Sequence, residues 1–318
     1  MKKRRKVLFA GPSHEILAKD LSLMNSEIVL GQINWGKFDD GFPNLKVLNA
    51  FELNDADVIF LADFCNTEEI FRQLAVLYSL AAHSINSLKV FLPFFSTGTM
   101  DRIMEEGQVV TAKTLARMLS IIPPAAHPAQ IIIFDIHALQ EQFYFSDQVR
   151  IRHISAINLL LHQLKLEGKT KDSFAVAFPD EGAYKRFGPY FKEYDQIVCE
   201  KRREIGGGRF ITIKEGIVKG KEILIVDDII LSGNTLLECA KLLVKEGATF
   251  ISTYATHGVF PKKNWNSFFD SGINLYLSDS CPKTVNDITT HVAYCPAPGT
   301  FKLISLAPAI MKEINSIQ

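Results

Sequence analysis

Two adjacent carboxylates stand inside the segment ILIVDDIILSGNTL, residues 223–236, directly after four apolar residues. Asp227 and Asp228 would lie at the carboxyl end of a parallel strand, which is where open α/β sheets bind ligands. Ionised carboxylates only accept hydrogen bonds, so the pair suits the vicinal hydroxyls of a ribose or a bound cation. The alternative is an ordinary strand, turn and helix in which both carboxylates are solvated.

A small polar loop follows the acidic pair and leads into an expected helix. Backbone N–H groups, the helix dipole and two hydroxyl groups would attract an anion there. Gly233 would let the backbone approach that anion without a Cβ in the way. A diol site and an anion site in one short segment predict a sugar phosphate. The residues of this candidate site are Asp227, Asp228, Ser232, Gly233, Asn234 and Thr235.

A cationic stretch stands shortly before a run of glycines. Lys201, Arg202 and Arg203 precede the three glycines at 206–208. Cations on a flexible segment can cover a phosphate group and then release the product, as a mobile lid does. The alternative is a solvated basic turn within a flexible loop.

Short apolar runs, rich in β-branched and aromatic residues, predict the strands that must position these groups. The runs are nearly continuous, which favours parallel sheets covered on both faces. Helical patterns separate them: Asn66 is expected to cap a helix in which Glu69 completes a capping box, and Gly247 to end another helix. The fold class is therefore α/β. The expected strands lie in KVLFAG, VIFLADF, LKVFLPFF, IIIFDIH, FAVAFPD, ILIVDDI, FISTYATHG and INLYLSDS.

The length and the charge balance set further bounds. A chain of 318 residues favours two domains, and apolar periodicity is lost near 146–154, so we expect domains at 1–150 and 151–318. The formal net charge is +0, so no global field recruits nucleic acid or anionic lipid. The sequence contains no run of about 18 apolar residues, so we expect no membrane span.

Cysteine usage bears on the compartment of the protein. The five cysteines are odd in number and none forms a C-x-x-C pair. This pattern favours neither a disulfide framework nor a zinc site, and it fits a reducing compartment. We therefore expect a cytoplasmic protein.

Residues 226–236 resemble the phosphoribosyl-binding loop of the type I phosphoribosyltransferase fold, written V-D-D-x-x-x-[ST]-G-x-T-L. Four further stretches resemble the ribose-phosphate diphosphokinase (PRPP synthetase) family: FDIHALQEQFYF, FPDEG, CEKRRE and NWGKFDDG. The amino-acid sequence is most similar to that of the plant-type branch, which is described as phosphate-independent. The resemblance implies two tandem type I phosphoribosyltransferase-like domains, each a mainly parallel sheet flanked by helices. The final segment of the chain can then pack back on the first domain.

The implied reaction transfers the diphosphoryl group of Mg-ATP to O1 of ribose 5-phosphate, giving PRPP and AMP. By resemblance, Lys201 and Arg203 act in the transition state, and the loop at 227–235 binds ribose 5-phosphate. His137 and Asp180 are implied ligands of a Mg²⁺ ion that bridges the ATP phosphates. Asp135 is expected to fix the local geometry before His137.

The resemblance also implies the residues that contact ATP. Phe38 and Asp40 suit stacking on adenine and hydrogen bonding to its amine. In the family this segment reaches the ATP of a neighbouring subunit, so a homo-oligomer is implied. The alternative is that Phe38 is a core residue and Asp40 forms a turn. The implied ATP-binding residues are Phe38, Asp40, Asp101, Arg102 and His137, and the sequence departs from the family at Leu231, Thr99, Met100 and Phe42.

Two segments bear on activation by inorganic phosphate. Residues 48–57, LNAFELNDAD, form an acidic turn without a cation, and residues 80–86, LAAHSIN, carry alanines where the phosphate-activated branch has basic residues. A fixed phosphate needs cations or clustered donors, so we expect no phosphate activation. Two other functions stay open: a phosphoribosyltransferase that consumes PRPP, and a non-catalytic regulator associated with the synthetase.

Overall fold

A computed structural model of the chain describes residues 4–203, 209–294 and 299–316 and divides the chain into two compact units. The first unit comprises Met1–Ser155 together with Ala307–Gln318, and the second comprises Ala156–Leu306. The segment in which we expected a boundary contains a strand, Arg150–Ile154, that pairs with Gln130–Phe134. The division therefore follows that strand.

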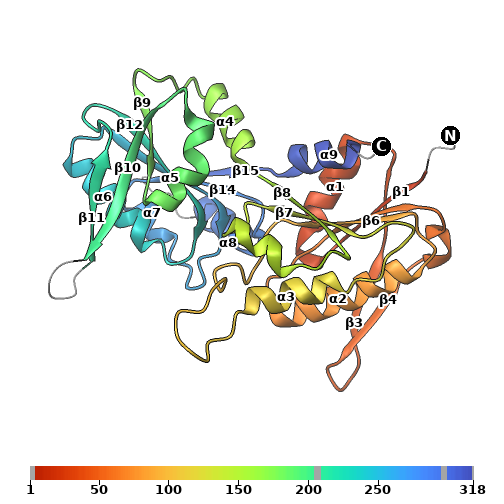
Figure 1. The fold of residues 1–318 in the computed structure, drawn as a ribbon. Coiled ribbons are helices and arrows are strands. Elements are labelled where there is room, and N and C mark those ends of the chain that lie inside the picture. The colour runs from red at the N-terminus through yellow and green to blue at the C-terminus, as the bar shows by residue number, and fades with distance from the viewer. Residues whose placement is uncertain (1–3, 204–208, 295–298, 317–318) are drawn as a thin grey trace. The chain divides into compact units, whose positions relative to one another are not determined.

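The first unit is built on a six-stranded parallel sheet in the order β2-β1-β5-β6-β7-β8. In Figure 1, α2 and α3 lie along one face of this sheet, and α1 and α9 lie along the other. The strands are β1 (Lys6–Ala10), β2 (Ile28–Leu30), β5 (Asp57–Leu61), β6 (Ser87–Leu92), β7 (Gln130–Phe134) and β8 (Arg150–Ile154). The helices are α1 (Glu15–Met24), α2 (Thr67–Ala82), α3 (Thr111–Ser120) and α9 (Ala307–Asn315), with 3₁₀ turns at Pro12–His14, Ala50–Leu53 and Leu139–Tyr144.

A separate hairpin belongs to the first unit. Its strands, β3 (Ile33–Lys37) and β4 (Pro43–Val47), pair only with each other and form a two-stranded antiparallel sheet. Figure 1 shows this hairpin projecting from the unit beside α2.

The second unit is built on a seven-stranded sheet in the order β11-β10-β9-β12-β13-β14-β15. All neighbouring strands are parallel except β10 and β11, which form an antiparallel pair at one edge. The strands are β9 (Phe174–Phe178), β10 (Asp195–Arg203), β11 (Arg209–Glu215), β12 (Glu222–Ile230), β13 (Phe250–Gly258), β14 (Asn274–Ser278) and β15 (Phe301–Ile304). The helices are α4 (Ile157–Leu166), α5 (Glu181–Phe187), α6 (Asn234–Lys245), α7 (Asn266–Asp270) and α8 (Pro282–Tyr294), with a 3₁₀ turn at Gly188–Phe191.

The two sheets share one connectivity. The order β1-β5-β6-β7-β8 in the first unit corresponds to β9-β12-β13-β14-β15 in the second. The loop from β5 to α2 therefore occupies the same topological place as the loop from β12 to α6. All eight apolar runs expected as strands form strands, because each is long enough to be buried between helical layers. The expectation of two α/β domains with mainly parallel sheets is confirmed.

The last helix of the chain is anchored to the first unit by a buried carboxylate. Glu313 of α9 is 3.1 Å from the guanidinium of Arg152 on β8. The Lys89 ammonium of β6 donates to the main-chain oxygen of Glu313 at 3.2 Å. These contacts place α9 in the first unit although it follows the whole of the second.

Helix boundaries follow the expected signals with one exception. The Asn66 side chain caps α2 by accepting from the Glu69 N–H at 2.9 Å. Gly247, at φ +95°, follows α6 and donates its N–H to the Val244 oxygen. The expected capping box is wrong, because the Glu69 carboxylate accepts from Arg72 and Gln73 instead. A buried guanidinium attracts that carboxylate more strongly than a backbone N–H does.

The described residues contain no helix that is both long and apolar enough to cross a membrane. Cys65, Cys199, Cys239 and Cys281 are free thiols. The Sγ atoms of Cys199 and Cys239 lie 3.6 Å apart in the core of the second unit.

Stability of the first unit is expected to fall at acid pH because of His14. This side chain is buried after β1, and burial, opposed by the nearby Asp63 carboxylate, lowers its pKa from 6.5 to about 4. The unfolded chain therefore binds a proton at a pH where the folded chain does not. Stability that is complete above pH 6.5 is lost as the pH falls toward 4, by about 3 kcal/mol in total. Denaturant unfolding of wild type and His14→Gln at several pH values checks this, since the variant should lack this part of the acid sensitivity. Parallel pH profiles for the two proteins would contradict the prediction.

Candidate active site

The acidic pair lies inside β12 rather than at its end. Pairing between β12 and β9 stops at Ile225, whereas pairing with β13 continues to Ile230. Our expectation that the strand ends at Asp227 is therefore wrong, because β13 accompanies β12 beyond the point where β9 has ended. Asp227 and Asp228 occupy the stretch where β12 has lost its neighbour on one side.

The two carboxylates differ in their surroundings. Asp228 is buried, and its Oδ2 lies 3.3 Å from Nη1 of Arg186 in α5. Asp227 accepts from the Asp228 N–H at 2.9 Å. Burial, followed by the charge of Asp228, raises the pKa of Asp227 well above its ordinary range. A ligand that brings hydroxyl groups or a cation to this pair would relieve its repulsion.

The loop from β12 to α6 forms the expected helix entry. Gly233 is the residue before the first turn and has φ +78°, a conformation that favours glycine. A Cβ at this position would lie 2.6 Å from Cε2 of Phe268, so packing as well as backbone geometry requires glycine here. Ser232 and Asn234 are exposed, and Thr235 is half-buried. The first N–H groups of a helix have no intrahelical partners, so this terminus can accept an anion.

Lys201 is joined to the acidic pair through a third carboxylate, Asp180. The lysine is on β10, and its Nζ is 3.1 Å from Oδ2 of Asp180. The other oxygen of Asp180 caps α5 by accepting from the Ala183 N–H at 3.0 Å. The charge of Asp180 also contributes to raising the pKa of Asp227, so these residues share one site. Arg202 instead forms an ion pair with Glu200.

Part of the expected lid lies outside the described residues. The backbone of Arg203 ends β10, but its side chain lies outside the described part of the chain, as do the glycines at 206–208. Within the second unit the structure brings together Asp180, Lys201, the acidic pair and the loop at 232–235.

The remaining candidates belong to the first unit. Phe38 and Asp40 are at the tip of the β3–β4 hairpin, where the Asp40 carboxylate accepts from the Phe42 N–H at 3.0 Å. Phe38 is 56% exposed, so its alternative role as a core residue is wrong, whereas Asp40 does stabilise a turn.

Two loops at the carboxyl ends of β6 and β7 hold the other candidates. Asp101 is buried, accepts at its main-chain oxygen from the Tyr144 hydroxyl, and lies 3.2 Å from Nε of the exposed Arg102. His137 is exposed and follows Asp135, which takes a φ of +34°. A Cβ at Gly98 would lie 3.5 Å from the Cβ of His137, so the two loops are in contact.

Two residues of the site were missed by sequence reasoning. Arg186 pairs with Asp228, and the side-chain amide of Asn264 donates to the main-chain oxygen of Ser232. Arg186 is preceded by a helical pattern that gives no sign of its partner, which is 42 residues away along the chain. Neither contact has a local signal. Among the described residues no group of three or more His, Cys, Asp or Glu side chains could hold a metal ion alone.

Comparisons with known proteins identify the family of the chain. Residues 6–122 match the N-terminal domain of ribose phosphate pyrophosphokinase, and residues 192–286 match the phosphoribosyl transferase domain. Ribose-phosphate pyrophosphokinase 4 of Arabidopsis thaliana is 42% identical over 99% of this chain and 93% of its own length. The chloroplastic ribose-phosphate pyrophosphokinase 3 of Oryza sativa is 43% identical over 94% of this chain and 73% of its own length.

A solved structure supports the fold. The phosphoribosylpyrophosphate synthetase of Mycobacterium smegmatis superposes with a TM-score of 0.81, at 20% identity, over 99% of both chains. The identity to the plant enzymes over almost the whole chain shows that this protein belongs to the ribose-phosphate pyrophosphokinase family.

Proposed function

We propose that this chain transfers the β,γ-diphosphoryl group of Mg-ATP to O1 of ribose 5-phosphate. The observation that carries the proposal is the edge of the second sheet, where Asp227 and Asp228 lie beside the start of α6 and beside the Lys201–Asp180 pair. This edge offers acceptors for a diol, a terminus for a phosphate group and a cation for a migrating phosphoryl group. Formation of AMP and PRPP from ATP and ribose 5-phosphate tests it directly.

The two alternatives are not favoured. The match to the pyrophosphokinase N-terminal domain covers residues 6–122, and full-length relatives carry the pyrophosphokinase name. A PRPP-consuming transferase would release diphosphate from PRPP and would form no AMP from ATP and ribose 5-phosphate. A non-catalytic regulator would form neither product.

The proposed reaction needs positioning and charge neutralisation rather than a covalent intermediate. Ser232, Asn234 and Thr235 hold the 5-phosphate at the start of α6, while Asp227 and Asp228 accept from the ribose hydroxyls. The O1 hydroxyl attacks the β-phosphorus and the bond from that phosphorus to the α,β-bridging oxygen breaks. AMP leaves with the bonding electrons, and the hydroxyl proton passes to solvent. Lys201 and Arg203 neutralise charge on the migrating group.

Magnesium fits as an ion that arrives with ATP. Mg²⁺ keeps several waters and binds phosphate oxygens with one or two protein ligands. The carboxylate of Asp180, whose side chain is 39% exposed, is an oxygen donor of the kind that Mg²⁺ prefers. Asp180 and His137, each on its own unit, are the residues that we propose for it. When bound, the ion supplies positive charge to the phosphates.

Asp180 and Lys201 are then expected to exchange partners. Lys201 neutralises Asp180 in the structure, at 3.1 Å. A triphosphate attracts Lys201 more strongly than one carboxylate does, so Asp180 would then be available as a ligand of the Mg²⁺ ion. Asp180 would stay paired with a positive charge.

We propose that four residues of the first unit contact ATP. Phe38, Asp40, Asp101 and Arg102 contact ATP, the first two from another copy of the chain, so the protein is a homo-oligomer. We also propose that no nucleic acid or membrane takes part. A cytoplasmic location stays a prediction, because relatives carry chloroplastic and mitochondrial names.

Lys201→Ala should lower kcat by about 10²-fold or more, because it removes a cation that acts on the migrating group. The KM for ribose 5-phosphate should change little, since the phosphate-binding loop lies at α6. Arg202→Ala is the matched control: Arg202 is adjacent, exposed and paired with Glu200, and its loss should leave kcat within a few-fold. Steady-state assays of AMP formation give the answer. A kcat near wild type for Lys201→Ala would remove this residue from the mechanism.

Thr235→Val should raise the KM for ribose 5-phosphate far more than the KM for ATP. The substitution keeps the shape of the side chain and deletes a hydroxyl at the start of α6. Thr249→Val, an exposed site next to the opposite end of β13, serves as the control. Equal changes in both KM values would show that this loop does not hold the sugar phosphate.

Inorganic phosphate should not be required as an activator. A cavity of about 430 Å³ lies between the acidic turn and the segment at 80–86, and its lining, as described, contains no Lys or Arg. The nearby cations Arg4 and Arg5 are engaged by Asp55 and Glu52, at 3.1 and 2.7 Å. Initial rates against added phosphate, in a non-phosphate buffer with saturating magnesium, check this. Steep activation from near zero would contradict it.

A further inference from the structure

The β3–β4 hairpin needs an anchor. It forms a two-stranded sheet of its own, and isolated hairpins are marginally stable in water. One face packs on the core of the first unit through Ile33, Trp35, Leu45 and Val47, which are all only partly buried. The tip, with Phe38 and Asp40, is exposed. Contacts at the base of the hairpin must therefore determine where the tip points.

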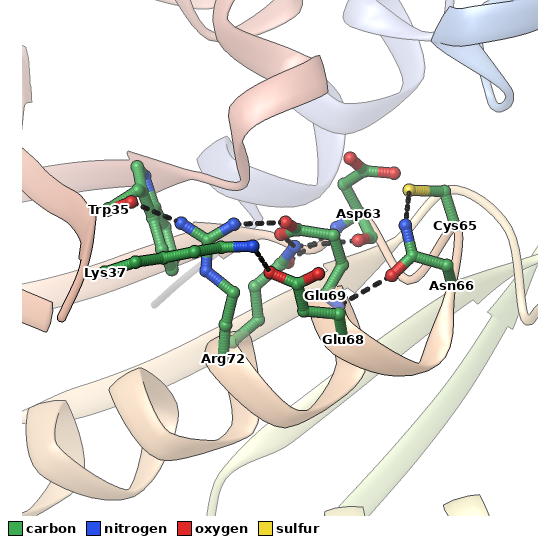
Figure 2. Close-up of polar contacts among 9 residues, drawn as sticks. Trp35, Lys37, Asp63, Cys65, Asn66, Glu68, Glu69 and Arg72 are labelled. Atoms are coloured by element: carbon green, nitrogen blue, oxygen red, sulfur yellow. Dashed lines mark hydrogen bonds and ion pairs between the residues drawn. The ribbon is translucent and has the colours of Figure 1, made fainter. Parts of the chain in front are cut away.

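Arg72 of α2 makes the contacts that can provide this anchor. Figure 2 shows its guanidinium between the main-chain oxygen of Trp35 and the carboxylate of Glu69. Its Nη2 donates to the Trp35 oxygen at 2.5 Å, and its Nη1 donates to Glu69 at 2.5 Å. The guanidinium carbon also lies 5.4 Å from the centre of the Trp35 ring. One side chain therefore holds both the backbone and the side chain of a hairpin residue.

Burial makes this contact specific. Arg72 is only 7% exposed, and the side chain of Glu69 is 13% exposed. Glu69 is itself oriented by Gln73, whose amide donates to it at 3.0 Å and also to the main-chain oxygen of Asp63. The anchor is thereby joined to the segment that follows β5. A planar guanidinium with several fixed donors can contact the Glu69 carboxylate, the Trp35 oxygen and the Trp35 ring at once. An ammonium group would satisfy this set less well.

A second ion pair joins the same two elements but is weaker. Lys37, at the end of β3, lies 2.5 Å from Glu68. The two side chains are 49% and 51% exposed, so water screens the pair. Figure 2 shows this pair next to the buried one. It provides a matched comparison on the same hairpin.

We infer that Arg72 is a positioning residue for ATP recognition: together with Glu69 it fixes the β3–β4 hairpin and so the direction in which Phe38 and Asp40 are presented. The inference rests on the proposed function, which assigns those two residues to the base of ATP. Arg72 itself does not touch substrate. Its loss should therefore act on the KM for ATP and leave the ribose 5-phosphate site unaffected.

The test uses the full chain and the double variant Glu69→Gln/Arg72→Met. Replacing both residues avoids an unpaired buried carboxylate, so the fold should persist while the anchor is lost. We expect the KM for ATP to rise about 10-fold or more, with kcat and the KM for ribose 5-phosphate within about 2-fold of wild type. The control, Lys37→Met/Glu68→Gln, should change the KM for ATP by less than about 2-fold.

A second measurement does not depend on activity. Amide hydrogen exchange of residues 33–47 should be faster in the Glu69→Gln/Arg72→Met variant than in the control, with exchange in β5 and β6 unchanged. An unchanged KM for ATP and unchanged exchange in a folded double variant would overturn the inference. If that variant does not fold, Arg72→Lys keeps the charge but not the paired donors. A raised KM for ATP in this variant supports the anchor, and a wild-type value overturns it.

The proposed function and the positioning role of Arg72 can fail separately. If wild type forms no AMP or PRPP, the proposed function fails, while hydrogen exchange still reports whether Arg72 holds the hairpin. If wild type is active and the double variant equals it in both measurements, only the inference fails.

Discussion

Repulsion among three carboxylates near the carboxyl ends of two central strands of the second sheet is the constraint on which the rest of the site depends. Asp180 follows β9, Asp227 and Asp228 lie on the neighbouring β12, and the three lie close enough to influence one another. Arg186 offsets Asp228 and Lys201 offsets Asp180, while the pKa of Asp227 stays raised. A ribose diol or a divalent cation would lower this repulsion. The charges that are unfavourable without a ligand therefore favour the binding of such a ligand.

The equivalent loop in the first unit leads into a helix whose first turn is satisfied by side chains of the protein itself. The start of α2 has an Asn66 cap and two acidic residues, Glu68 and Glu69, so its dipole is satisfied within the protein. The start of α6 has no acidic residue in its first turn and has glycine before it. Identical topology therefore yields, in one unit, the terminus that we propose for the 5-phosphate and, in the other, a structural junction. The difference lies in a few side chains at the first turn.

Much of this could be predicted from the sequence, because the relevant signals are local. The apolar runs predicted the strands, which the structure confirms. The order of acidic pair, small loop and helix predicted a sugar-phosphate site, which stays a prediction. What the sequence could not show depends on residues that are distant along the chain. β12 runs past Asp227 because β13 continues beside it, and Arg186 reaches Asp228 across 42 residues. Gly233 also illustrates this limit, since Phe268, which is distant along the chain, leaves no room for a Cβ at this position.

Arg72 shows most clearly why long-range contacts decide a role. Glu69 and Arg72 are spaced i, i+3 on a helix, which by pattern alone is typical of a solvated surface pair of small effect. The capping box predicted for Glu69 was wrong for the same reason: the pattern contained no information about Trp35, which lies 37 residues earlier in the chain. The hairpin covers this pair and removes it from water, so an ordinary helix pair becomes a buried contact between two elements. Its two donors then bind one partner on the helix and one on the hairpin. A side chain that looks like part of a solvated face can in this way determine the direction of the hairpin tip through its contact with Trp35 on β3.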